Sequence, residues 1–250
     1  MKAVVLAGGL GTRLQPYTFF IPKPMLPLGN KPLLEHIIEW LKRSDGGGYV
    51  KGIDHIVLCV SYLHRTIEDY FEDGRRFGVK IEYARSERPL ATAGQLKTAE
   101  DLLDDDAFVC LYGDSVYEFD LAKMISAHRK FKAFVSMALL SYKTKLKYGF
   151  IDLDVQEGGN NSNSNRVTRW IEKPEVSGLI NIGCYVIEPE FLKFIPISSA
   201  FGMDDAVRKA LEQKRIVKGH KIVESGFIDI GDKKSYLDAY KKYVDKLGKI

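Results

Sequence analysis

The sequence predicts an α/β fold in which a mostly parallel sheet is covered by helices on both faces. Short apolar runs with the length of buried strands alternate with stretches whose apolar residues recur at helical spacing. Such an alternation is typical of three-layer proteins. The 250 residues are 45% hydrophobic and 28% charged, which suffices for one large domain or two closely joined halves.

The first part of the chain supplies the clearest alternation. Its first strand is expected at Ala3–Ala7, and Pro32–Lys42 follows as an amphipathic helix before a loop at Ser44–Gly48. Further strands are expected at Ile56–Val60, Lys80–Ala84, Phe108–Tyr112 and Ala133–Leu140, and further helices at Thr66–Phe71, at Ala93–Leu103 and from an Asp120 cap to about Lys130. Loops after the carboxyl ends of parallel strands carry ligand sites, so the loop after the first strand should meet Asp114 at one edge.

The character of the chain changes at Tyr148. Two short strands, Ile151–Asp154 and Arg166–Glu172, are expected around a polar loop at Gln156–Asn165. Later elements are a strand at Leu179–Ile187, helices at Pro189–Phe194 and Asp204–Gln213, strands around Ile216 and Ile222, and a last helix from Lys234 to about Leu247 with Tyr236, Leu237, Tyr240, Tyr243 and Val244 on its apolar stripe.

Composition excludes several classes of protein. The net charge is only +4, and the cationic stretches at 143–147 and 209–221 lack the interleaved aromatics of a nucleic-acid platform. No apolar run approaches the ~20 residues of a membrane helix, and Met1-Lys2 leads directly into a strand without a visible signal peptide. Cys59, Cys110 and Cys184 lie in apolar runs without CxxC spacing, so we expect reduced core thiols and a cytoplasmic location.

A glycine-rich loop follows the first strand. Gly8, Gly9 and Gly11 allow a sharp turn with backbone N–H groups against a ligand, and the cations Arg13 and Lys23 follow. This combination suits a polyphosphate. The spacing matches neither the dinucleotide fingerprint, because Leu14 stands where its third glycine would be, nor the Walker A loop. Taken alone, the glycines fit a tight turn with surface cations equally well.

The longer run Gly8-Gly-Leu-Gly-Thr-Arg-Leu-x-Pro-x-Thr-x-x-x-Pro-Lys-Pro-Met-x-Pro resembles the signature of the sugar-1-phosphate nucleotidylyltransferases. Four more segments resemble motifs of that family in the same order: Pro89–Gly94, Tyr112–Asp114, Glu172–Pro174 and Ile228–Gly231. The resemblance covers residues 2 to about 239. It implies a Rossmann-like nucleotide-diphospho-sugar transferase fold and a single catalytic domain at 1–250. That domain would have a nucleotide-binding half at about 1–115 and a sugar-phosphate-binding half at about 116–250, without the C-terminal β-helix of many relatives.

The resemblance also implies roles for individual residues. Arg13 and Lys23 would be catalytic, and Asp114 and Asp229 would hold Mg²⁺. The nucleotide would be bound by Leu6, Ala7, Gly8, Gly9, Gly11, Thr12, Arg13, Lys23, Pro89, Ala93 and Gly94. The sugar phosphate would be bound by Tyr112, Gly149, Glu172, Lys173 and Asn181.

These residue types suit the implied reaction. A sugar 1-phosphate oxygen attacks the α-phosphorus of a nucleoside triphosphate in line, and pyrophosphate leaves. The attacking oxygen is already an anion and needs no general base, so positioning and cations carry the catalysis. The fork of Arg13 suits the β- and γ-phosphates, Lys23 the α-phosphate, and Lys173 the incoming phosphate. Carboxylates at Asp114 and Asp229 suit Mg²⁺.

Each residue alone also has a purely structural explanation. Asp114 and Asp229 could serve as turn or cap residues, Glu172 and Lys173 as an ion pair at a strand end, and Asn181 as a partner for backbone groups. The order of five motifs favours the functional interpretation. Three segments depart from the family: Tyr112 replaces Asn, Ala91 replaces Gly, and Asp232-Lys233 stands where Gly-Thr-Pro is common.

We therefore expect an enzyme that forms an NDP-sugar from an NTP and a sugar 1-phosphate. The residues of the motifs favour mannose 1-phosphate with GTP, or glucose 1-phosphate with dTTP or UTP, as the substrates. The alternatives are a non-catalytic regulatory subunit that binds NDP-sugars, and nucleotidyl transfer to a non-sugar phosphate. The family suggests a homo-oligomer, and neither nucleic acid nor a membrane is an expected partner.

Overall fold

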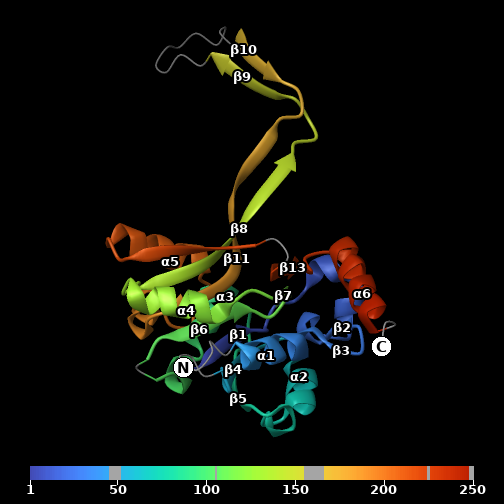
Figure 1. The fold of residues 1–250 in the computed structure, drawn as a ribbon, viewed down its shortest axis with the longest axis vertical. Coiled ribbons are helices and arrows are strands. Elements are labelled where there is room, and N and C mark those ends of the chain that lie inside the picture. The colour runs from blue at the N-terminus through green and yellow to red at the C-terminus, as the bar shows by residue number, and fades with distance from the viewer. Residues whose placement is uncertain (45–51, 105, 155–165, 224–225, 248–250) are drawn as a thin grey trace.

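The computed structural model describes residues 1–44, 52–104, 106–154, 166–223 and 226–247. It consists of a body built around a seven-stranded sheet and a long projection that we call the arm, described at residues 141–154 and 166–180 (Figure 1). The polar loop expected at Gln156–Asn165 lies outside the described residues, as does most of the loop expected at Ser44–Gly48.

The central sheet is mixed and mostly parallel, as the sequence predicts. Its strand order is β12-β8-β11-β6-β1-β4-β5, and β11 runs antiparallel to both neighbours. The other neighbouring pairs are parallel. The bounds are β1 Ala3–Leu6, β4 His55–Val60, β5 Lys80–Arg85, β6 Phe108–Tyr112, β8 Val135–Lys145, β11 Glu175–Ile187 and β12 Val217–Ile222.

Two apolar cores cover the two faces of this sheet. Successive side chains of a strand point to opposite faces, so Val5 of β1 packs into one core and Val4 into the other. The first core includes apolar side chains of α1 (Leu33–Arg43), α2 (His64–Phe71), α4 (Leu121–Lys130) and α6 (Lys233–Leu247). The second includes those of α3 (Ala91–Lys97) and α5 (Met203–Glu212). The predicted three-layer α/β architecture is confirmed.

Two small sheets complete the body. The pair β2 (Pro27–Leu28) and β3 (Lys31–Pro32) leads into α1. The pair β7 (Ser115–Tyr117) and β13 (Phe227–Asp229) joins the segment after β6 to the segment before α6. No helix in the described parts of the chain combines the length and apolar character needed to cross a membrane. All three cysteines are buried and free, as expected.

The arm extends two strands of the central sheet. Strands β8 and β11 remain paired beyond the body, from Ser141 opposite Leu179 to Lys145 opposite Glu175. At the far end β9 (Phe150–Asp154) pairs with β10 (Arg166–Ile171). Figure 1 shows this ribbon leading away from the body.

Several expected boundaries are wrong. The helix expected at Ala93–Leu103 ends at Lys97, because the Thr98 hydroxyl donates to the Gln95 carbonyl, and a separate 3₁₀ turn follows at Glu100–Leu102. Pro189–Phe194 is 3₁₀ rather than α-helical, and a single strand, β12, replaces the two expected around Ile216 and Ile222.

The apolar stripe of the last helix is also only partly correct. Tyr236 is buried and Tyr243 packs against the core, whereas Leu237, Tyr240 and Val244 are 36–45% exposed.

Candidate active site

The glycine-rich loop leaves the carboxyl end of β1 and is held in place by its neighbours. The Gly8 N–H donates to Gln95 Oε1 at 3.1 Å, and a side chain at Gly8 would collide with that amide. Gly11 has φ +62°, and the buried Thr18 hydroxyl donates to its carbonyl at 2.8 Å. The turn therefore requires glycine at position 11. Gln95, which directly follows Gly94, is not among the residues that the sequence singles out.

Lys23 is the best-positioned cation of the site. It lies in a 3₁₀ turn at Lys23–Met25 and is only 6% exposed. Its Nζ donates to Asp114 Oδ2 at 2.7 Å, so the loop after β1 and the residue after β6 meet at one sheet edge as expected. Burial of an ammonium group is costly without a counter-charge, and Asp114 provides one.

A cavity of about 180 Å³ lies between these groups. Its lining consists of Gly11, Thr12, Arg13, Leu14, Lys23, Asp114 and Gly231. The Arg13 side chain is exposed, unlike that of Lys23. Two cations face one carboxylate here, so the cavity favours an anionic ligand. Gly231 is an addition to the predicted set and is the last residue of the motif that contains Asp229.

The two carboxylates expected to hold a metal approach each other through β7 and β13. Asp229 pairs in register with Ser115, which directly follows Asp114. Among the described residues no group of three or more His, Cys, Asp or Glu side chains has metal-binding geometry. Two carboxylates fit Mg²⁺ nonetheless, because it is usually held by one or two carboxylates while phosphates and water supply the remaining oxygens.

The segment expected beside the nucleotide base forms the start of α3. Gly94 packs closely on the loop before α5, and an added Cβ would lie 2.5 Å from the Ser199 carbonyl oxygen. This packing alone explains why the position requires glycine. The Thr92 hydroxyl accepts a hydrogen bond from the Met203 N–H at 2.8 Å. Ala91 has φ +54°, a conformation that favours glycine. Pro89 is exposed and Ala93 is buried.

Tyr112 and Asn181 are linked through the Tyr185 hydroxyl where β11 leaves the body. The Tyr112 and Tyr185 hydroxyls lie 3.2 Å apart, and the Asn181 amide donates to the Tyr185 hydroxyl. Asn181 Oδ1 also accepts from the Gly183 N–H, so this side chain has the backbone partner that the structural explanation anticipates. Burial raises the pKa of the Tyr112 phenol, which therefore stays neutral and able to donate.

The remaining sugar-phosphate candidates lie on the arm. Gly149 is close to Trp170 and Glu172, since a Cβ at position 149 would lie 3.1 Å from Glu172 Oε2 and 3.2 Å from Trp170 Nε1. The Glu172 and Lys173 side chains are 60% and 63% exposed and 3.7 Å apart. The structure thus brings Arg13 and Lys23 together with Asp114, but places Gly149, Glu172 and Lys173 outside that cluster.

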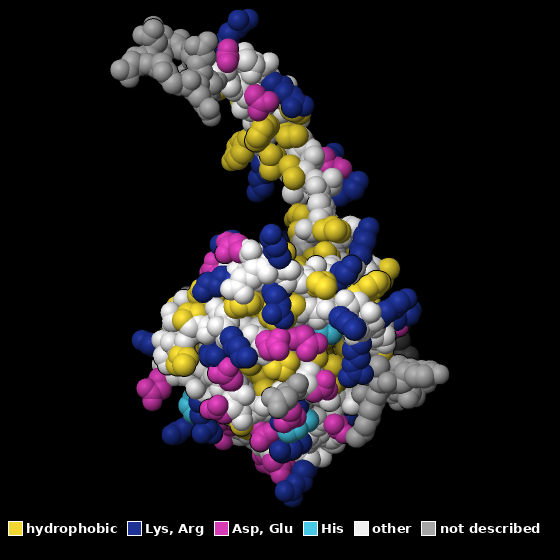
Figure 2. Space-filling view, turned by 90° about the vertical axis from the view of Figure 1, so that its left-hand side faces the viewer, with side chains coloured by type: hydrophobic (Ala, Val, Ile, Leu, Met, Phe, Trp, Pro, Cys, Tyr) yellow, Lys and Arg dark blue, Asp and Glu magenta, His cyan; other side chains and the backbone are white. Residues whose placement is uncertain are grey.

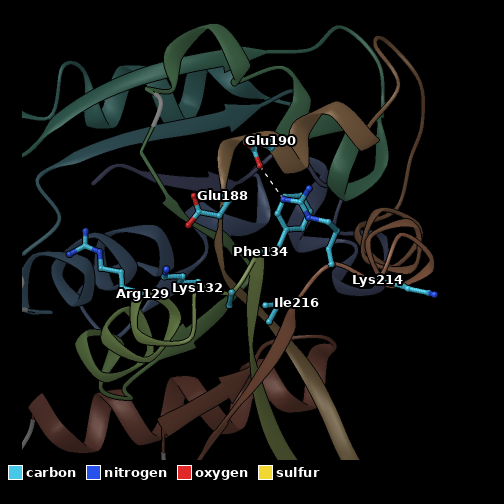
Figure 3. Close-up of a pocket in the computed structure, with 9 residues that line it drawn as sticks. Arg129, Lys132, Phe134, Glu188, Glu190, Lys214 and Ile216 are labelled. Carbon is cyan, nitrogen blue, oxygen red and sulfur yellow. Dashed lines mark hydrogen bonds and ion pairs between the residues drawn. The ribbon is translucent and has the colours of Figure 1, made fainter.

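A larger hollow of about 520 Å³ lies at the opposite end of the sheet, where β8 and β12 begin (Figure 3). Its lining includes the labelled Arg129, Lys132, Glu188 and Lys214. Glu190 receives a hydrogen bond from Arg215, and Glu188 lies 3.0 Å from His128 Nε2. Its carboxylates are thus already engaged, and its position separates it from the phosphate-binding loop.

Comparison with known proteins identifies relatives over the whole chain. The family model described as "Nucleotidyl transferase" matches residues 2–246. The D-glycero-alpha-D-manno-heptose 1-phosphate guanylyltransferase of Aneurinibacillus thermoaerophilus is 34% identical, over 97% of this chain and 98% of that protein. The UTP–glucose-1-phosphate uridylyltransferase of Synechocystis is 31% identical, and the mannose-1-phosphate guanylyltransferase catalytic subunit beta of Xenopus tropicalis is 29% identical. The chain spans only 63% and 66% of those two proteins.

Solved structures share the fold of this chain. The crystal structure of HddC from Yersinia pseudotuberculosis has a TM-score of 0.71 and 26% identity, covering 97% of this chain and 99% of that one. A UDP-glucose pyrophosphorylase complexed with UDP-glucose, at 24% identity, shares the fold with a TM-score of 0.70 and covers 98% of both chains.

Proposed function

This chain belongs to the nucleotidyl transferase family, in its sugar-1-phosphate nucleotidylyltransferase branch, and we propose that it transfers a nucleotidyl group from an NTP to a sugar 1-phosphate. The observation that carries the proposal is the cavity in which Arg13 and Lys23 meet Asp114 beside the glycine-rich loop. It offers two cations and a carboxylate where a triphosphate and a metal would lie together.

In the proposed reaction an oxygen of the sugar 1-phosphate forms a bond to the α-phosphorus. The bond from the α-phosphorus to the oxygen bridging it to the β-phosphorus breaks, and pyrophosphate leaves with that electron pair. Lys23 stabilises the negative charge that develops around the α-phosphorus, and Arg13 holds the β- and γ-phosphates. No side chain needs to remove a proton, because the attacking phosphate is already ionised.

Asp114 and Asp229 would hold Mg²⁺, which supplies charge neutralisation for the triphosphate. Without a metal, the contact between Lys23 and Asp114 keeps both charges compensated in a partly buried place. A nucleotide that draws Lys23 toward its α-phosphate leaves the carboxylate of Asp114 available to a cation. This exchange of partners couples nucleotide binding to metal binding.

The acceptor side is proposed to consist of Tyr112, Gly149, Glu172, Lys173 and Asn181. Lys173 would pair with the phosphate of the sugar, and Glu172 would accept hydrogen bonds from its hydroxyls. The nucleotide-binding half would then extend over about residues 1–115 and the sugar-phosphate-binding half over about 116–250. The three buried free thiols support a cytoplasmic location.

For the substrates we favour GTP and a sugar 1-phosphate of manno configuration. The support comes from relatives that match this chain over nearly their whole length and are named manno-heptose 1-phosphate guanylyltransferases, at 32% and 34% identity. Mannose-1-phosphate guanylyltransferases from vertebrates, rice and yeast also match.

The test is pyrophosphate release with Mg²⁺ across a grid of substrates. GTP, dTTP, UTP, CTP and ATP are each paired with mannose, manno-heptose, glucose and N-acetylglucosamine 1-phosphates. The proposal predicts turnover that is highest with GTP and a manno-configured acceptor. Turnover highest with UTP or dTTP and glucose 1-phosphate would overturn the substrate assignment alone. No turnover in any pair, with NDP-sugar binding retained, would favour a regulatory subunit.

A further inference from the structure

The arm leaves the body at the edge of the sheet that carries the phosphate-binding cavity. Gly183 packs against the Tyr112 ring at the end of β6, and β11 continues outward from there through Asn181. At about 3.4 Å per residue, the stretch from Asn181 to Glu175 alone spans roughly 20 Å. Glu172 and Lys173 lie beyond that stretch, so the proposed acceptor residues of one chain are far from its own Lys23.

The arm carries apolar side chains without a core to cover them. Figure 2 shows them gathered partway along the arm. Trp170 is 68% exposed and Tyr148 is 81% exposed. The other exposed apolar residues of the arm are Tyr142, Leu146, Phe150, Ile151, Leu153, Val167, Val176, Leu179 and Ile180. A two-stranded ribbon is at best marginally stable by itself, and a gathering of exposed apolar side chains of this size marks an interaction site.

A second exposed apolar set lies on the body beside the phosphate-binding loop. We call it the loop patch, and it consists of Leu10, Tyr17, Phe19, Phe20 and Ile21. Phe20 is 82% exposed, and the Phe19 and Phe20 rings meet edge to face at 6.5 Å. Arg13 lies within the same stretch of chain. Whatever covers this patch therefore lies next to the proposed triphosphate site.

The root of the arm resists folding back onto its own body. The β8–β11 pairing continues without interruption from Leu139 opposite Asn181 to Lys145 opposite Glu175. The register shift between Asn181 and Tyr185 is held by the Tyr112 ring and by the hydrogen bonds of Asn181. Closing the arm onto its own loop patch would break part of this ladder. Docking of the arm onto a second copy leaves the β8–β11 hydrogen bonds intact.

We propose that two copies of this chain exchange arms, so that the arm of each copy covers the loop patch of the other. Glu172 and Lys173 would then complete the active site of the opposite copy, beside its Arg13 and Lys23. The inference rests on the acceptor residues assigned under the proposed function. Only a second copy presents both an apolar patch for the arm and a phosphate site that lacks these residues. With a twofold axis between the two copies, each arm covers the loop patch of the other copy. No arm or loop patch is then left uncovered, so the assembly is closed as a dimer.

The extent of the surfaces fits a stable dimer. Such interfaces bury roughly 1,600 Å² or more in total and use about 20–30 residues on each side. By number of residues, the 29 described residues of the arm and the five of the loop patch are comparable to one side of such an interface. The exposed aromatic residues Tyr148, Phe150 and Trp170 are the residue types that dominate such contacts.

The first experiment measures mass. Full-length chain is compared in light scattering with an arm-shortened chain, in which an Asn-Gly turn replaces residues 143–177 between the register partners Tyr142 and Gly178. We expect a full-length dimer and a folded arm-shortened monomer. A full-length monomer, or an arm-shortened dimer, would overturn the proposal whatever the activity. An inactive dimer that needs its arm would contradict the proposed function while supporting arm exchange.

The second experiment determines whether each active site is completed by the arm of its own chain or by the arm of the other chain. Lys23→Ala and Lys173→Ala chains with different tags are co-expressed, and the mixed dimer is isolated through both tags. Turnover is measured with the sugar 1-phosphate well below its wild-type KM, where the raised KM of Lys173→Ala makes that variant slow. In an exchanged dimer one site joins an intact body to an intact arm, so turnover reaches about half of the wild-type value. The matched control is Lys23→Ala with Asp114→Asn, two changes on the body, which leaves every site defective.

Three results separate the possible failures. A mixed dimer no faster than the Lys173→Ala homodimer would show that each arm serves its own body and would overturn the proposal. Full activity of the Lys173→Ala homodimer would remove Lys173 from the acceptor site and with it the basis for exchange. Recovery in the control pair would show that the readout does not report on arm exchange, and would count against the proposal.

Discussion

The body and the arm hold their proposed functional residues in opposite ways. Lys23 is buried, is paired at 2.7 Å with Asp114, and lies in the 3₁₀ turn Lys23–Met25 of the body. Lys173 is 63% exposed and has the positive φ of 44°, and its nearest carboxylate, that of Glu172, lies 3.7 Å away. The body therefore positions its cation in the isolated chain, whereas the arm requires a further surface to do so.

This contrast explains a division of work in the proposed reaction. The triphosphate needs fixed charges because its transition state gains most from groups that do not reorganise. The sugar phosphate only has to be delivered to them in the correct orientation. Rigid elements of the body suit the first task, and a ribbon that docks from elsewhere suits the second.

The largest expected effect belongs to Lys23→Ala. Removal of a preorganised cation at the reacting phosphorus should lower kcat by about 10²–10³-fold, with little change in KM for the sugar 1-phosphate. Lys97→Ala is a matched control, because Lys97 is equally buried and is also paired at 2.7 Å with a partly exposed carboxylate, that of Glu100. Steady-state kinetics on both variants decides the matter, and near-normal turnover of Lys23→Ala would remove this residue from the mechanism.

Asp229→Asn should have the next largest effect. Loss of one of two carboxylates would raise the Mg²⁺ concentration needed for half-maximal turnover by about tenfold or more. Asp238→Asn, an exposed change on α6, should leave the Mg²⁺ dependence unchanged. Titration of activity with Mg²⁺ measures both. An unaltered midpoint in Asp229→Asn would exclude this residue from the metal site.

Lys173→Ala should act on the acceptor alone. A charge-assisted contact is worth about 1.5–3 kcal/mol, so KM for the sugar 1-phosphate should rise at least roughly tenfold while KM for the NTP stays the same. Lys143→Ala is the control on the same arm, because Lys143 is also exposed and lies 3.4 Å from Glu175. Equal effects of the two substitutions would mean that arm charge in general, and not Lys173, binds the acceptor.

Much of the body could be predicted from the sequence because its signals are local. The apolar run at Ala3–Ala7 and the helical spacing in Pro32–Lys42 report burial within a few residues, and β1 and α1 lie there. The meeting of the glycine loop with Asp114 followed from the parallel order of strands. The end of α3 could not be predicted from the sequence, because it depends on a hydrogen bond from the Thr98 hydroxyl to the Gln95 carbonyl.

The outer strands of the arm, β9 and β10, lie where two short strands were expected, but the root of the arm could not be predicted in this way. Residues 141–145 are Ser-Tyr-Lys-Thr-Lys, which carries no burial pattern, and the expected strand therefore ended at Leu140. The strand continues because residues 175–179, distant in sequence, provide its hydrogen-bonding partner. The same long-range pairing separates Glu172 and Lys173 from the body cluster, a separation that motif order along the chain does not reveal.

The smallest expected effect concerns the start of α3 on the body. Ala91 adopts φ +54° where the family commonly has glycine. Ala91→Gly relieves roughly 1 kcal/mol of left-handed backbone strain but loses about 0.4–1 kcal/mol through the freer unfolded chain. Stability should be unchanged or rise by less than about 1 kcal/mol. Ala127→Gly, in the interior of α4, should instead lower the stability by about 1 kcal/mol. Denaturant unfolding compares them, and a clear loss in Ala91→Gly would contradict the strain argument.

The most direct test of the division between body and arm is to measure the arm-shortened chain with both substrates. Calorimetry should show that it binds Mg²⁺ and an α,β-methylene analogue of GTP as tightly as the full-length chain does. With GTP and the sugar 1-phosphate, it should release no pyrophosphate. Release at the full-length rate would show that the acceptor site does not need the arm. Loss of nucleotide binding in a folded arm-shortened chain would show that the body does not hold the triphosphate alone.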